Sequence, residues 1–298
     1  MKQRITPCLW FDDEAEEAAK FYTSIFTNSK ITQVSKYNEE MAKAADRPKE
    51  SVMIVKFELN SQEFIGLNGG PIFKLNPSIS MFVHCETKEQ VDTLFKKLSQ
   101  GGQVMMELDK YPFSERYVFI ADKYGLSWQI MLSKEKHHIE PAILFVKKSF
   151  GKAEEAIKYY IKVFKNSKVN HIEKYKKGQD VKEGTVMYSS FVLEGEHFSA
   201  MDGPGTHEFG FNEAFSFTVN CKGQEETDYY YDKLAKDGSE QPCGWVKDKF
   251  GISWQINPIE FTEMVSDKNP KKVQATLKAM LQMKKLDLKK FREAFDKG

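Results

Sequence analysis

The sequence lacks long apolar runs, closely spaced cysteine pairs and any excess of charge of one sign. Its 298 residues carry a formal charge of +1, so neither nucleic acid nor an acidic membrane is indicated as a partner. No stretch approaches the roughly 20 apolar residues of a membrane-spanning helix, and the N-terminus, MKQRITPCLW, has no signal-peptide run. The cysteines Cys8, Cys85, Cys221 and Cys243 show no CxxC spacing. These absences predict a soluble, cytoplasmic protein with reduced thiols.

A glycine-rich turn between a strand and a helix is also missing. The nearest glycine clusters are LNGGP at 67–71 and MDGPG at 201–205. Both follow one expected strand and precede another, where glycine serves a tight turn. A cradle for a nucleotide-like cofactor is therefore not indicated, and no Gly-x-Ser-x-Gly nucleophile motif is present.

What the sequence does contain is a tandem repeat. DKYGLSWQI at 122–130 returns as DKFGISWQI at 248–256, and ITPCLWF at 5–11 returns as IEPAILF at 139–145. The repeat unit is about 130 residues, which suits a whole domain. We therefore predict three regions: a first copy at 1–134, a second copy at 135–258 and a helical extension at 259–298.

Each copy is expected to contain strands and two helices, in the order β-α-β-β-β given twice. The stretch around Ala15–Phe26 has apolar residues at helical spacing. In the second helix of the first copy, Thr87 is the expected N-cap and Gly101 the expected end. The first copy is also longer before its last strand, since Gln103–Trp128 spans 26 residues and Ser239–Trp254 only 16.

The block ITPCLWFDDEAEEAAKFY and the block DKFGISWQI, in this strand order, resemble the PhnB-like branch of the vicinal oxygen chelate superfamily. That superfamily includes glyoxalase, bleomycin-resistance proteins and extradiol dioxygenases, and the branch is often labelled 3-demethylubiquinone 3-methyltransferase. The resemblance covers roughly 3–132 and 138–258. It implies an α+β fold in which paired βαβββ units form a cupped mixed sheet, and a fused pair that acts as an internal pseudo-dimer or assembles as a homodimer.

In metal-dependent relatives, strand residues supply imidazole and carboxylate ligands to one divalent cation. By strand position the first copy offers Thr6, Asn68, Ser78 and Gln129. The second copy offers Glu140, Asp202, Ala214 and Gln255. No histidine stands at these positions, so we expect no transition-metal cofactor.

Glu140, Asp202 and Gln255 together are a weak candidate site for a hard divalent cation. The alternative is that Glu140 is an exposed residue before a strand, Asp202 a turn residue that bonds its own backbone, and Gln255 a residue that bonds within the sheet. His84 aligns with Asn220, and His138 is assigned to the polar joint SKEKHH at 133–138.

Neighbouring residues on a strand point to opposite faces, so Trp128 and Trp254 are expected in the core and the following glutamines in a cleft. The expected pocket residues are Trp10, Phe82, Phe119, Gln129, Phe217 and Gln255, although the favoured interpretation of the aromatic residues is that they fill the core. The favoured function is binding of a small, partly apolar molecule without a transition metal. The alternative is a metal-dependent lyase, isomerase or dioxygenase that uses the second copy. A methyltransferase that uses S-adenosylmethionine is not indicated.

The extension at 259–298 is expected to form two helical pieces. Asn269 and Pro270 suit an N-cap and first helical residue, and Asp287 suits a second N-cap. The apolar stripe that follows each of them must pack on the domains or on a partner chain.

Overall fold

The computed structural model describes residues 3–134 and 136–298, which form four successive βαβββ units and a C-terminal helical extension. The first unit comprises β1 (Ile5–Phe11), α1 (Ala15–Ile25), β2 (Lys30–Lys36), an added α2 (Glu39–Ala45), β3 (Val52–Leu59) and β4 (Gln62–Asn68). The second comprises β5 (Ile79–Cys85), α3 (Lys88–Leu98), β6 (Gln103–Tyr111), β7 (Ser114–Ala121) and β8 (Ser127–Leu132).

The second copy repeats this order. Its first unit comprises β9 (His138–Phe145), a 3-10 turn at Lys147–Ser149, α4 (Ala153–Val163), β10 (Lys168–Lys174), β11 (Val186–Leu193) and β12 (Glu196–Asp202). Its second comprises β13 (Phe215–Cys221), α5 (Gly223–Ala235), β14 (Ser239–Glu240), β15 (Trp245–Lys247) and β16 (Ser253–Pro258). The extension holds α6 (Ile259–Met264), α7 (Pro270–Met280) and α8 (Leu288–Lys297).

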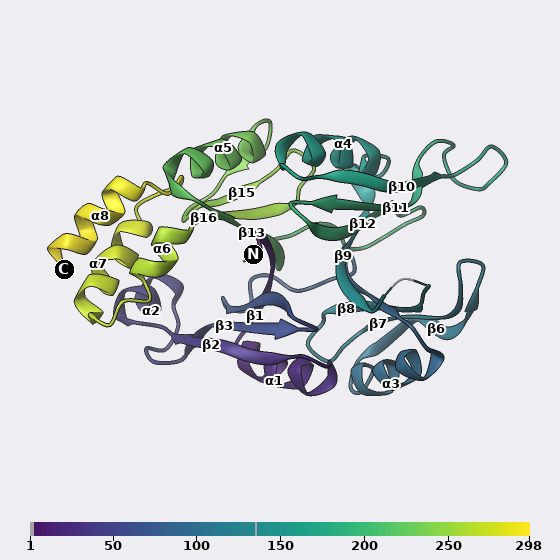
Figure 1. The fold of residues 1–298 in the computed structure, drawn as a ribbon, viewed down its shortest axis with the longest axis horizontal. Coiled ribbons are helices and arrows are strands. Elements are labelled where there is room, and N and C mark those ends of the chain that lie inside the picture. Colours follow the sequence, from purple (N-terminus) through teal and green to yellow (C-terminus); the bar gives the residue numbers. More distant parts are fainter. Residues whose placement is uncertain (1–2, 135) are drawn as a thin grey trace.

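The strands form two eight-stranded mixed sheets, each shared between the two copies. Sheet A has the order β14-β15-β16-β13-β1-β4-β3-β2, and sheet B has the order β10-β11-β12-β9-β5-β8-β7-β6. The copies meet at two antiparallel central pairs, β1 with β13 and β5 with β9. In Figure 1 the first copy forms the lower arms of both sheets and the second copy the upper arms, with α1 and α3 below and α4 and α5 above.

The predicted α+β fold of paired βαβββ units is confirmed, but one copy does not supply a whole sheet. Each sheet pairs one unit of the first copy with one unit of the second. The four units are alike, so the sequence repeat does not reveal which units hydrogen-bond to each other. The two cups are therefore joint products of both copies.

The main core joins one face of each sheet to the buried sides of α1, α3, α4 and α5. The opposite face of each sheet, here called its outer face, points away from this core. Phe198 of sheet B and Phe217 of sheet A meet across the core with ring centroids 5.5 Å apart. Trp128 and Trp254 are fully buried there, which confirms their predicted core placement.

The repeated nonapeptide builds the same buried contact twice. The indole of Trp128 donates to Asp122 Oδ2 at 2.8 Å, and the backbone amides of Tyr124 and Leu126 donate to Asp122 Oδ1. In the second copy Trp254 donates to Asp248 at 2.9 Å, and the hydroxyl of Tyr160 adds a bond of 2.6 Å. Each aspartate thus closes the turn before its strand and anchors the tryptophan.

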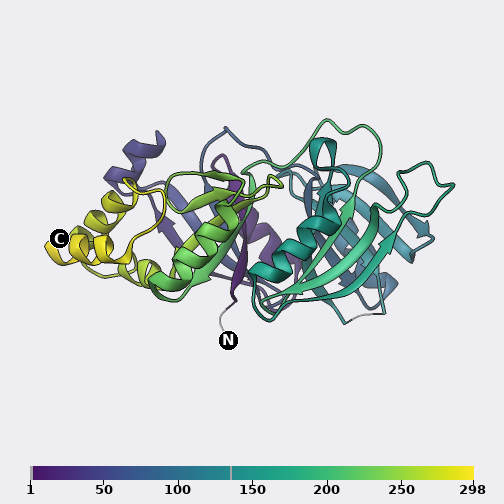
Figure 2. The ribbon, with the colours of Figure 1, turned by 90° about the horizontal axis from the view of Figure 1, so that it is seen from above.

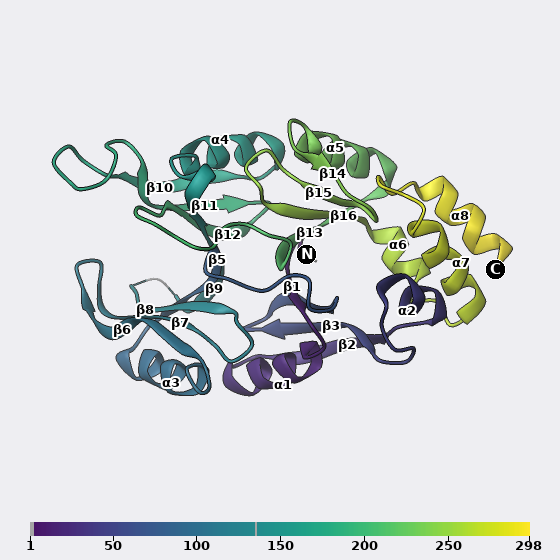
Figure 3. The same ribbon diagram turned by 180° about the vertical axis from the view of Figure 1, so that it is seen from behind.

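The extension packs at the edge of sheet A, beside α2 and α5. Its helices bury a second, separate core of Phe261, Leu277, Met283, Leu286, Leu288 and Phe291, with Met41 of α2 packed against it. Figure 2 and Figure 3 both place α6–α8 at one end of the molecule, with sheet B at the other.

The predicted N-caps Thr87, Asn269 and Asp287 all accept backbone hydrogen bonds. Among the described helices, none has the length and apolarity to span a membrane.

Candidate functional site

The candidate site lies on the outer face of sheet B, where four strands place polar and aromatic side chains in a row. Glu140 on β9 lies opposite Phe82 on β5, Phe82 opposite Gln129 on β8, and Gln129 opposite Phe119 on β7. A second row lies two residues along each strand: His138, His84, Met131 and Tyr117. The alternation of strand side chains puts both rows on one face.

Glu140 is the centre of the polar end of this face. It is only 2% exposed, and its carboxylate lies 3.5 Å from the Nε2 atoms of both His84 and His138. The hydroxyl of Ser199 on β12 donates to the same carboxylate. Burial alone would raise the pKa of Glu140, but the two imidazoles and Ser199 outweigh it and lower the pKa to about 2. Glu140 is therefore a buried carboxylate that stays ionised.

The apolar end of the face is organised by Gln129. Its amide nitrogen donates to Ser80 Oγ at 2.9 Å, and its carbonyl oxygen accepts from the Tyr117 hydroxyl at 2.8 Å. Phe82 and Tyr117 form a small apolar cluster with Ala142, and Phe119 and Met131 pack against it. This arrangement fixes the glutamine and the tyrosine, and leaves partly exposed aromatic surface on the face.

Two hollows adjoin the site. A polar cavity of about 470 Å³ lies beside His138, lined by Gln3, Glu58, Asn60, Ser61, Gln62, Glu63, Ile139, Glu196 and His197. A larger groove of about 1300 Å³ lies beyond Met131, between the β6–β7 turn and the joint of the two copies. His138 therefore borders the first hollow and Met131 the second, and both belong to the second row.

His84, His138 and Glu140 have ligand atoms within 4.8 Å of one another, and their donor types suit a divalent transition metal. Their orientation does not. The imidazole rings of His84 and His138 stack with centroids 4.2 Å apart and planes 5° apart. A ring nitrogen binds a metal in the plane of its ring, and two parallel stacked rings share no such plane. A tetrahedral ion would require one imidazole to turn, so this arrangement does not fit a bound metal.

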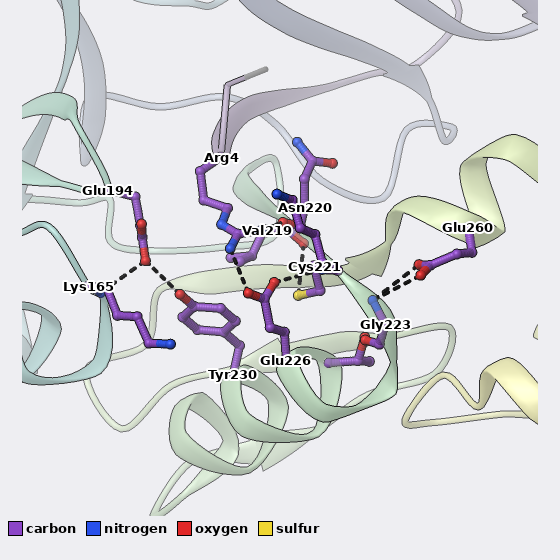
Figure 4. Close-up of polar contacts among 12 residues, drawn as sticks. Arg4, Lys165, Glu194, Val219, Asn220, Cys221, Gly223, Glu226, Tyr230 and Glu260 are labelled. Atoms are coloured by element: carbon purple, nitrogen blue, oxygen red, sulfur yellow. Dashed lines mark hydrogen bonds and ion pairs between the residues drawn. The ribbon is translucent and has the colours of Figure 1, made fainter. Parts of the chain in front are cut away.

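On sheet A, the position that corresponds to Glu140, His84 and His138 is occupied by a network of hydrogen bonds. Arg4 and Asn220 there correspond to His138 and His84 in the repeat. Arg4 donates to the carbonyl of Asn220 at 2.6 Å and to Glu226 on α5 at 2.9 Å, as Figure 4 shows. The counterpart of Glu140 is Thr6, which accepts from Asn220 at 3.4 Å. Sheet A therefore has no carboxylate at this position.

The predicted pocket residues fall on different faces. Phe82, Phe119 and Gln129 lie together on the outer face of sheet B, as the two rows show. Trp10 and Gln255 lie on the outer face of sheet A, where Gln255 bonds Ser216 and Trp10 contacts Phe73 and Trp245. The prediction for Phe217 was wrong: it is fully buried in the main core against Trp254, because its neighbours on the strand occupy the outer face.

The weak candidate cation site was also wrong, because its three members are dispersed. Glu140 lies on sheet B and Gln255 on sheet A. Asp202 ends β12 and accepts from the backbone amides of Gly151, Ala153 and Val186, so its role is structural, but it does not bond its own backbone as the alternative supposed.

The sequence analysis missed His84 and His138. Strand β9 begins at His138, which therefore does not belong to the joint between the copies. The signal was the spacing: His138 precedes Glu140 by two residues and His84 follows Phe82 by two, so each histidine shares a face with a candidate residue. Comparison of the copies concealed this, because it matched His84 with an asparagine.

Comparisons with known proteins agree with the fold. The family described as 3-demethylubiquinone-9 3-methyltransferase matches residues 3–131 and 137–257, so the chain belongs to this family. A Bacillus cereus protein described as a putative 3-demethylubiquinone-9 3-methyltransferase, PhnB protein, is 41% identical over 44% of this chain and all of its own, with a TM-score of 0.41. Glyoxalase I from Zea mays is 10% identical over 84% of this chain and 89% of its own, with a TM-score of 0.54. No curated protein matches the chain.

Proposed function

We propose that this member of the family binds a small, partly apolar molecule on the outer face of sheet B, without a transition metal. The observation that carries the proposal is the buried, ionised Glu140 at one end of an aromatic row. A buried charge is costly unless it is paired or hydrogen-bonded, and two imidazoles and one hydroxyl already surround this one. A ligand group that donates hydrogen bonds completes the set.

The rest of the face supports a ligand with an apolar body. Phe82 adjoins Glu140, and Phe119 lies two strands further along the row. Aromatic rings at such positions add contact area and orient flat groups. Three strand steps separate Glu140 from Phe119, about 14 Å at the usual strand spacing. The ligand class is therefore a short amphiphile with a hydrogen-bond donor at one end.

Methyl transfer from S-adenosylmethionine is not part of the proposal. The two glycine clusters follow β4 and β12 and lead to the strands β5 and β13. Neither glycine cluster opens a helix, where backbone amides would hold a charged cofactor.

The proposal is tested with three probes of one shape: 3-phenylpropylamine, 3-phenylpropanol and 3-phenylpropionate. Saturation-transfer NMR should show contact for the amine and the alcohol and much less for the acid, which the Glu140 carboxylate repels. Glu140→Gln should remove this preference. Equal signals from all three probes in both proteins would contradict the proposal.

A matched pair of variants locates the binding face. Gln129 and Gln255 stand at the same place in the repeat, and each donates to a serine, at 2.9 Å and 3.0 Å. Gln129→Ala should weaken binding of the amine, and Gln255→Ala should leave it unchanged. The reverse result would place the site on sheet A.

A metal-dependent activity is the second candidate, favoured by the donor types of His84, His138 and Glu140 alone. It ranks lower because the stacked imidazoles do not converge on one point.

A further inference from the structure

The β6–β7 hairpin distinguishes the outer face of sheet B from that of sheet A. Strands β6 and β7 have nine and eight residues, whereas their counterparts β14 and β15 have two and three. In Figure 1 and Figure 3 this hairpin projects at the end of the molecule away from α6–α8. The ten extra residues of the first copy thus lengthen one wall of the candidate site and have no counterpart on sheet A.

The tip of this hairpin carries aromatic rings that the core does not use. The rings of Tyr111 and Phe113 stack with centroids 5.7 Å apart. The ring of Phe113 also packs edge to face on Tyr117, with centroids 4.9 Å apart. Phe113 is nonetheless 59% exposed. A large exposed ring within a local aromatic cluster offers a surface for another flat group.

The groove of about 1300 Å³ connects these rings to the candidate site. Tyr111, Phe113 and Met131 all line it. Met131 lies opposite both His84 and Tyr117 in the strand register. A molecule bound at Glu140 that extends past His84 and Met131 of the second row therefore reaches the groove.

The groove is lined by charged residues of both signs, three lysines and two glutamates. Its rim carries lysines and glutamates, namely Glu86, Lys110, Glu115, Lys134 and Lys136. Lys110 and Glu115 neutralise each other at 2.7 Å. The stacked rings of Tyr111 and Phe113 are the apolar part of this lining, and the group that fits them is flat and uncharged.

We propose that Tyr111 and Phe113 determine specificity by holding a flat, uncharged apolar group at the far end of the molecule bound at Glu140. This inference rests on the proposed function and adds the shape of the ligand: a donor group at one end and a flat terminal aromatic ring at the other.

The test compares two amines that differ by one ring, 3-phenylpropylamine and 3-(biphenyl-4-yl)propylamine, by calorimetric titration. The longer amine should bind the wild-type protein about tenfold more tightly, which corresponds to about 1.4 kcal/mol and lies within the range of an aromatic pair. Phe113→Ala, alone and combined with Tyr111→Ala, should remove this advantage and leave the shorter amine unchanged. Phe113→Tyr should retain it.

The control is Met106→Ala, which alters another exposed apolar side chain of the same hairpin, 36% exposed and outside the groove lining. It should change neither affinity. If the longer amine keeps its advantage in the double variant, or has none in the wild type, the role of the hairpin is refuted and the proposed function stands. If neither amine binds the wild type, both proposals fail. Thermal unfolding of each variant confirms that the chain is folded.

Discussion

Asp122 and Asp248 show how one residue type accounts for the repeated nonapeptide. Each carboxylate is almost fully buried and accepts an indole N–H and backbone amides. The sequence predicted the core position of both tryptophans from strand alternation, but not their partner, because the aspartate lies six residues earlier on the far side of a turn. A turn that folds back on its own strand is not visible in a period-two pattern.

The burial of Asp122 predicts a pH dependence of stability. Burial raises its pKa to about 6 from an ordinary value of 3.8, against the lowering effect of Trp128 and Tyr22. Between these two values the folded state keeps a proton that the unfolded chain has lost, so stability falls as the pH rises. Asp122 should therefore contribute a decrease on the order of 3 kcal/mol in the free energy of unfolding from about pH 4 to pH 6.

Asp122→Asn should flatten this decrease, as measured by urea unfolding at half-unit pH steps. Asp248 has a pKa raised by burial as well, so part of the slope remains in the single variant. Asp180→Asn, at an exposed position, is the control and should not alter the slope. An unchanged slope in Asp122→Asn would show that this carboxyl group is not protonated in the folded protein.

The stacked imidazoles predict how the chain responds to zinc. With ring planes only 5° apart, His84 and His138 should not form a stoichiometric zinc site with Glu140. Calorimetric titration of zinc should show no bound ion that is lost in His84→Ala. His171→Ala, at an exposed position, is the control. One tightly bound zinc per chain that disappears only in His84→Ala would instead support the metal-dependent candidate.

At the scale of elements, apolar periodicity located the strands and helices that contribute to the core. It did not locate β2 or β6, although three strands were expected after each helix. Both are edge strands with mostly exposed side chains, so neither has the alternation of a half-buried strand. The added helix α2 was also missed, because seven residues with one buried alanine give little amphipathic pattern.

The extension was predicted from its N-caps and apolar stripes, and its separate core leads to a test of independence. Phe291 is fully buried in that second core, and its ring centroid lies 4.7 Å from that of Phe261. Phe291→Ala should destabilise the extension by about 3–5 kcal/mol through the cavity that it leaves. Hydrogen exchange should then increase across α7 and α8 while the strands of sheet B stay protected. Equal loss of protection throughout would mean that the extension and the sheets unfold as one unit.

At the scale of the whole molecule, the strand order makes the two copies depend on each other. Each copy alone would expose β1 and β5, or β9 and β13, as unpaired edges that are apolar and nearly fully buried in the intact chain. Exposed apolar edges pair with other chains. The site itself needs both copies, because Glu140 and His138 come from the second, while His84, Phe82 and Gln129 come from the first.

This dependence predicts the behaviour of two separately expressed fragments, residues 1–134 and 135–298. Alone, neither should be a well-folded monomer, and the first fragment should self-associate through β1 and β5. Mixed in equal amounts after refolding, they should form a one-to-one complex in size-exclusion chromatography with light scattering. The complex should bind 3-phenylpropylamine, whereas neither fragment should do so alone, because Glu140 and Gln129 lie on different fragments. A monomeric first fragment with a cooperative unfolding transition would contradict the shared-sheet architecture, since its central strands would then be stable without partners.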